Sequence, residues 1–180
     1  MTDEASDRAE TTPSNEAVMG AVIVGVVPDQ STRVLGEGAR YAKLLGAPLL
    51  VVHVDVTRFV TYEDPDGYVH SAPIDLNIAA GEGELAKVTE TVTAFLSGHD
   101  IDWTIQQLVG DPAMAIKHLA EKIDAKLIVV GTRKRGLGES IREFFTGSVA
   151  ARLAHRQHRS ILVVPLGEPV ADDEDIWPGQ

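Results

Sequence analysis

The chain has 180 residues, of which 44% are hydrophobic and 24% are charged, as in an ordinary globular protein. A chain of this length normally forms one domain and buries most of its apolar surface. It contains no cysteine, which excludes disulfides and thiolate chemistry. No apolar run approaches membrane-spanning length, and the first residues lack the basic and apolar regions of a signal peptide. We therefore expect a soluble, cytoplasmic protein with no membrane partner.

The formal net charge of −11 is concentrated at the two ends of the chain. Residues 1–17 carry a net charge of −4, residues 167–180 carry −5, and the middle of the chain therefore carries only −2. Acidic, polar ends of this kind predict disordered arms at 1–17 and 167–180 around one domain at 18–166. Nothing in this charge distribution indicates nucleic-acid binding.

The first predicted element is a short, β-branched apolar run at 21–27, which is typical of a strand covered on both faces. Apolar residues then recur with helical spacing over 31–46. We expect Ser31 to be the N-cap of this helix and Gly46 to follow its last turn.

A second buried strand is predicted at 48–56. The polar segment 57–76 is predicted to be a long loop with a turn at 64–67, where the sequence reads DPDG. A helix is predicted over 82–98, and the alternating pattern over 101–109 predicts a strand nearer to a sheet edge.

Asp111 and Pro112 have the residue types of the N-cap and first position of a third helix. Apolar strands at 126–131 and 160–166 flank a last helix at 148–155. Strands that alternate with helices and read as continuous apolar runs predict an α/β fold. We expect a single Rossmann-like domain, with a five-stranded, mainly parallel sheet and helices on both faces.

The segment GTRKRGLGESIREFFTGS, from Gly131 to Ser148, combines glycines with basic side chains. From Gly131 to Arg159 there are seven basic and two acidic residues, a net charge of +5. Glycine-rich turns and helix N-termini at the carboxyl ends of parallel strands present N–H groups to anions. The segment therefore predicts a phosphate site formed by Gly131, Gly136, Gly138, Gly147 and Ser148, with Arg133 and Lys134 assisting. The alternative left open is that Gly147 and Ser148 only cap a helix.

The residues KLIVVGTRKRG and FFTGSVAARLAHRQHRSILVVP, with AVIVGVV and LLVVHVDV upstream, resemble the universal stress protein family over residues 20–166. The resemblance implies a five-stranded parallel domain of the adenine nucleotide alpha hydrolase-like type. The family is usually dimeric, and many of its members bind ATP or AMP. The resemblance implies that Gly131, Gly147 and Ser148 contact phosphates. It also implies that Val149 continues from Ser148 into the helix. It also matches Val54 to the position whose backbone reads the adenine edge, and Val130 to a flank of the base or ribose.

Two departures from the family pattern put retained binding in question. Gly147 follows Gly131 by 16 positions, which is longer than the family spacing, and Lys134 stands where a second glycine belongs. The acid that usually ends the first strand is replaced by Val27, and Asp29 lies two residues later.

We expect a universal stress protein that binds ATP or AMP, with or without Mg²⁺, and forms a homodimer through the strand at 160–166. No P-loop, G-x-S-x-G or G-x-G-x-x-G motif is present, and no general base stands beside a nucleophile, so we expect no enzyme activity beyond slow or incidental hydrolysis. His53, which lies among valines, is interpreted as a core histidine, and no metal site is expected. The alternative function is a nucleotide-free, dimeric protein-interaction module of the same fold.

Overall fold

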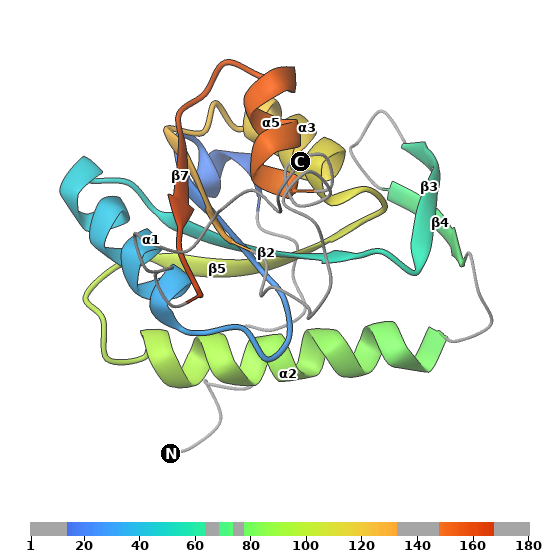
Figure 1. Cartoon of the computed structure of the whole chain (residues 1–180), viewed down its shortest axis with the longest axis horizontal. Helices are drawn as coiled ribbons and strands as arrows, with labels where there is room; N and C mark the ends of the chain where they lie inside the picture. The colour runs from blue at the N-terminus through green and yellow to red at the C-terminus, as the bar shows by residue number, and fades with distance from the viewer. Residues whose placement is uncertain (1–13, 64–68, 74–77, 133–147, 168–180) are drawn as a thin grey trace, which may run out of the picture.

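The computed structural model describes residues 14–63, 69–73, 78–132 and 148–167 (Figure 1). Five strands form one sheet in the order β5-β2-β1-β6-β7, and every neighbouring pair is parallel. The α/β fold predicted from the sequence is therefore confirmed. The strands are β1 (Val22–Val26), β2 (Leu49–Asp55), β5 (Trp103–Val109), β6 (Leu127–Gly131) and β7 (Ile161–Val164).

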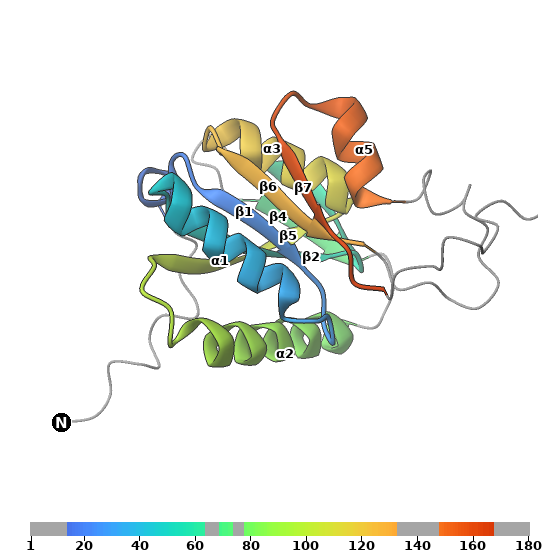
Figure 2. The same cartoon turned by 60° about the vertical axis from the view of Figure 1, so that its left-hand side comes forward.

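Helices cover both faces of the sheet (Figure 2). One face packs against α1 (Arg33–Leu45) and α2 (Ile78–Leu96), and the other packs against α3 (Pro112–Lys122) and α5 (Val149–Arg156). Successive residues of a strand point to opposite faces, so each strand supplies both of the hydrophobic clusters that result. Among the described helices, none combines the length and apolar character that a membrane span requires.

The ends of the helices follow the local sequence. Gly46 takes the left-handed conformation, with φ of 56°, directly after α1, as predicted. Asp111 caps α3 by accepting a hydrogen bond from the Met114 N–H at 3.0 Å, also as predicted. The prediction for Ser31 is wrong by one residue, because the N-cap of α1 is Thr32. Ser31 Oγ instead accepts a hydrogen bond from the Arg33 N–H at 3.3 Å.

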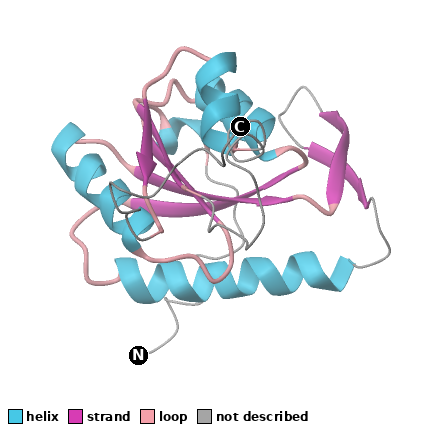
Figure 3. Ribbon diagram, viewed as in Figure 1, coloured by secondary structure: helices cyan, strands magenta, loops and turns pink. Residues whose placement is uncertain are grey.

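Segment 57–76 was predicted to be a loop, and this prediction is wrong. The structure forms an antiparallel hairpin from β3 (Arg58–Glu63) and β4 (Val69–Pro73), beyond the carboxyl end of β2 (Figures 1 and 3). The strand RFVTYE is rich in aromatic and β-branched residues, which favour a strand, but its interspersed polar residues weaken the apolar pattern. The predicted turn at 64–67 lies outside the described residues.

A short 3-10 helix, η1 (Asn15–Val18), precedes β1 and lies at the end of the segment 1–17 for which disorder was predicted. The rest of that arm, residues 1–13, and the tail from residue 168 onward lie outside the described residues.

Candidate functional site

The candidate site lies where the strand order changes direction. The chain passes from β1 to β2 on one side and returns to β6 on the other side of β1. In open α/β sheets, ligands bind beyond the carboxyl ends of the strands at such a switch point. The loop after β1, the end of β6 and the N-terminus of α5 all lie at this carboxyl edge, because a helix that connects parallel strands runs antiparallel to them.

Three of the predicted site residues lie on the α3/α5 face of the sheet. Val130, near the end of β6, is only 4% exposed and belongs to the hydrophobic cluster on that face. Val54 of β2 and Val149, the first residue of α5, are half-buried and pack against the same cluster. Two strands and one helix thus each contribute one of these apolar side chains to the same face of the sheet.

Ser148 is the N-cap of α5, and its Oγ accepts a hydrogen bond from the Ala151 N–H at 3.4 Å. The capping role left open by the sequence is therefore present. The hydroxyl proton is not used by this bond and can still be donated to an anion at the helix N-terminus.

Gly131 ends β6, and its α1 side is filled by the protein's own side chains. A Cβ atom on this residue would overlap Gln30 Nε2 and would lie 2.7 Å from Leu166 Cδ1 and 3.0 Å from Val34 Cγ2. A side chain at this position would therefore displace the ends of the Gln30 and Leu166 side chains. The space over this glycine on the α1 side is therefore occupied, and the predicted phosphate turn that follows it lies outside the described residues.

Hydrogen bonds fasten the segments that cover Gly131. Gln30 Oε1 accepts a bond from the Val27 N–H at 3.1 Å, within the loop after β1. The Leu166 N–H donates to Thr132 Oγ1 at 2.8 Å, and Arg33 Nη1 donates to the Pro165 carbonyl at 3.1 Å. The ends of β1, β6 and β7 are therefore tied to one another at the switch point.

Sequence reasoning did not include Gln30, Arg33 or Leu166 among the site residues. A signal for the first two was available, because they lie in PDQSTR, the first strand-to-helix turn, and such turns border the switch point of this fold class. Leu166 carried no comparable signal, because its place over Gly131 depends on the pairing of β7 with β6.

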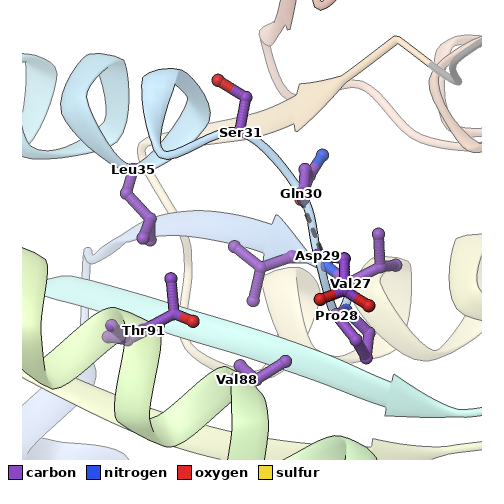
Figure 4. Close-up of a pocket in the computed structure, with 10 residues that line it drawn as sticks. Val27, Pro28, Asp29, Gln30, Ser31, Leu35, Val88 and Thr91 are labelled. Carbon is purple, nitrogen blue, oxygen red and sulfur yellow. Dashed lines mark hydrogen bonds between the residues drawn. The ribbon is translucent and has the colours of Figure 1, made fainter.

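Asp29 does not join the valine group. It is an exposed residue with φ of 57°, and it lines a hollow between the loop after β1 and α2 (Figure 4). This hollow measures about 280 Å³ including its open mouth, and its apolar lining includes Leu35, Val88 and Val92. Asp29 therefore lies toward α1 and α2, on the opposite side of the sheet from Val54.

The remaining predicted site residues, Arg133, Lys134, Gly136, Gly138 and Gly147, lie outside the described residues.

Two other arginines of the basic segment form ion pairs with acidic side chains of the protein. Arg159 Nη2 lies 3.0 Å from Asp124 Oδ1. Arg152 forms a bidentate ion pair with Asp111, in which Nη1 donates to Oδ2 at 2.6 Å and Nη2 donates to Oδ1 at 2.8 Å. Part of the net positive charge of this segment thus serves packing rather than a free anion site.

The ion pair between Arg152 and Asp111 fixes α5 to the N-terminus of α3. Partial burial by itself raises the pKa of Asp111. The hydrogen bonds from Arg152 and the Met114 N–H, with the charge of Arg152, outweigh this effect and hold the pKa below its ordinary value. The carboxylate therefore stays charged at neutral pH and positions the first turns of both helices.

His53 is 1% exposed, as expected for a core histidine. Its Nδ1 lies 3.4 Å from the Val26 carbonyl oxygen, and its Nε2 lies 3.6 Å from Glu84 Oε2 of α2. Within the described part of the chain, no group of three or more His, Cys, Asp or Glu side chains is placed to hold a metal ion.

A model of the universal stress protein family matches residues 19–165 of this chain. The chain belongs to the universal stress protein family. A search of curated proteins found no match.

Solved structures of universal stress proteins share the fold. One from Archaeoglobus fulgidus is 23% identical, with a TM-score of 0.59 over 80% of this chain and 97% of that one. An A. fulgidus universal stress protein in complex with dAMP is 22% identical, with a TM-score of 0.53 over 82% and 98% of the two chains. Another universal stress protein, in complex with cAMP, is 24% identical, with a TM-score of 0.53 over 83% and 99%.

Proposed function

We propose that this universal stress protein binds an adenine nucleotide at the carboxyl edge of its sheet, on the side of α5. The observation that carries the proposal is that Val54, Val130 and Val149 all belong to or pack against the apolar cluster on the α3/α5 face, and that α5 on this face has a capped N-terminus. Apolar side chains provide a surface on which a base can pack, and a helix N-terminus favours a phosphate.

The related structures in complex with dAMP and cAMP support this choice of ligand class. Both ligands are adenine nucleotides with a single phosphate group, which one helix N-terminus can accept. We propose AMP-type nucleotides as the first ligands to test, with ATP, alone and with Mg²⁺, as the second. We propose a regulatory rather than a catalytic role for this ligand. The absence of catalysis and the cytoplasmic location stay predictions of the sequence.

A thermal-shift series with AMP, dAMP, cAMP, ATP and ATP with Mg²⁺ tests the proposal, together with equilibrium dialysis against labelled AMP and ATP. Ligand that binds only the folded chain stabilises it by about 2.7 kcal/mol at 100 times Kd, so the melting temperature should rise with ligand concentration. Absence of uptake of AMP and ATP at millimolar concentration would end the proposal.

A matched pair of variants locates the site. Ser148→Asp retains a good N-cap but places a negative charge where the phosphate is expected, so the fold should be kept and AMP binding should be lost. Ser97→Asp adds the same charge just after α2, at the opposite edge of the sheet, and should leave AMP binding unchanged. Equal loss of AMP affinity in both variants would remove Ser148 from the proposed site.

We also propose that the chain forms a homodimer through β7. This strand is an edge of the sheet, and its Val163 side chain is 44% exposed. An edge strand with unpaired backbone groups and exposed apolar side chains is suited to an interface. Light scattering should give twice the mass of the chain, and a monomer would refute this part. A dimer without any nucleotide-dependent rise in melting temperature would favour the alternative, a nucleotide-free interaction module.

A further inference from the structure

Gln30 crosses the crevice of the switch point. Its backbone belongs to the loop after β1, and its side chain reaches over to Gly131 at the end of β6. The amide is held in place, because Oε1 accepts the Val27 N–H at 3.1 Å, a bond marked by the dashed line in Figure 4. The side chain is half-buried, so the protein encloses part of it.

The space around this amide is closed by further side chains. Val34 from the first turn of α1 and Leu166 from the segment after β7 approach Gly131 so closely that a single added methyl group would not fit. Leu166 is fixed through its N–H to Thr132 Oγ1, at 2.8 Å. The amide of Gln30 is thus the polar group among the three side chains that cover this glycine on the α1 side.

The other end of the amide is unused. Among the described residues, Gln30 Nε2 has no hydrogen-bond partner, although Oε1 is engaged. The Nε2 end of the amide thus occupies space beside the end of β6, at the edge of the sheet where ligands of this fold class bind.

We propose that Gln30 limits the nucleotide affinity of this chain, because its side chain covers the end of β6 from the α1 side and a nucleotide bound from the α5 side has to extend over the same end of β6. This inference rests on the proposed function and deepens it. A nucleotide that reaches the ends of β1 and β6 has to turn the amide away. The Val27–Gln30 hydrogen bond and the contact with Gly131 are then lost. A smaller residue at position 30 removes this competition.

The test measures AMP binding by calorimetry in wild type and in Gln30→Ala. The net contribution of one hydrogen bond predicts that the variant binds AMP roughly threefold to tenfold more tightly. The melting temperature of the ligand-free variant should stay equal to that of wild type or fall slightly, since the same bond is lost from the free protein. A merely structural role would lower both stability and affinity. A rise in AMP affinity without a rise in the melting temperature of the ligand-free variant therefore identifies the proposed effect.

Two further variants control this result. Gln107→Ala makes the same change at an exposed position of β5, near the same edge of the sheet, and should leave AMP affinity as in wild type. Gln30→Glu keeps an oxygen for the Val27 N–H but replaces the amide donors with a second carboxylate oxygen, so AMP should bind more weakly than to wild type. In wild type, the side-chain amide signals of Gln30 in an NMR spectrum should shift when AMP is added.

The outcomes separate this inference from the proposed function. If wild type binds AMP and Gln30→Ala binds it equally or more weakly, the inference is overturned and the proposed function stands. If wild type does not bind and Gln30→Ala does, the inference stands and the proposed function of the native chain fails. Absence of binding in both overturns both.

Discussion

The two faces of the sheet differ in their surroundings at the carboxyl end of β6, although the neighbouring residues Val130 and Gly131 form them. Val130 faces α3 and α5 and belongs to the apolar cluster against which the half-buried side chains of Val54 and Val149 also pack, and α5 begins at a capped N-terminus. Gly131 faces α1, where Gln30 and Leu166 leave no room for a Cβ atom. A glycine that fits a phosphate-binding pattern is thus covered, on one of its sides, by side chains of the protein itself.

The helices α1 and α5, on opposite faces of the sheet, are also held by different contacts. The N-terminus of α1 is joined to β1 by a short loop and is tied across the sheet through the bond from Arg33 to the Pro165 carbonyl. The helix α5 is held by Leu153, which is fully buried, and by the ion pair of Arg152 with Asp111. The proposed nucleotide side therefore depends on one buried side chain and one partly exposed ion pair.

The largest expected effect comes from removing the buried anchor of α5. Leu153→Ala should lower the free energy of unfolding by about 2–5 kcal/mol and should weaken AMP binding, because α5 carries Ser148 and Val149. Val34→Ala, on the α1 side, should lower it by about 1.5–3 kcal/mol without weakening AMP binding. Urea unfolding and calorimetry, under conditions where both variants are folded, measure the two quantities. Equal loss of AMP affinity in both variants would contradict the assignment of the ligand to the α5 side.

A smaller effect is expected at the ion pair of α3 and α5. Asp111→Ala should cost about 1 kcal/mol at neutral pH through the lost N-cap, and more through the lost pairing with Arg152. The pKa of Asp111 is lowered in the folded state, so its contribution is fully present above the ordinary value of 3.8. It is lost as the pH falls through the lower folded value. Urea unfolding at neutral pH and near pH 3 should therefore show a shrinking difference between wild type and the variant.

Asp111→Asn is the matched control for this pH dependence. Asparagine retains the N-cap but cannot carry the charge, so its unfolding free energy should lie between those of wild type and Asp111→Ala at neutral pH. A difference between wild type and Asp111→Ala that is the same at both pH values would show that the charge of Asp111 contributes nothing.

The smallest effects are expected on the outer surfaces of the helices. Glu37 pairs with Arg40 on α1 at 3.1 Å, and Glu121 pairs with Lys117 on α3 at 3.5 Å. Glu37→Gln and Glu121→Gln should each change the unfolding free energy by at most about 0.5 kcal/mol, and added salt should reduce the change. A larger change in the unfolding free energy of either variant would show that the α1 side and the α3 side also differ on their outer surfaces, away from the carboxyl edge of the sheet.

The sequence by itself determined the parts of this protein that follow from local pattern. Buried parallel strands read as continuous apolar runs, so β1, β2 and β6 were predicted within a few residues. The caps at Gly46 and Asp111 were predicted because each depends on one residue and its immediate neighbours. The hairpin of β3 and β4 was missed, since its polar residues resemble those of a loop until the two strands pair.

The tertiary structure alone decided how the candidate site is divided. The family resemblance placed Val130 and Gly131 in one site, but successive residues of a strand face opposite sides of the sheet, so the two residues face different helices. The contacts of Gln30 and Leu166 with Gly131, and of Arg152 with Asp111, join residues that are distant in the chain. Such contacts are set by strand order and helix packing. No local pattern of residues therefore encodes them.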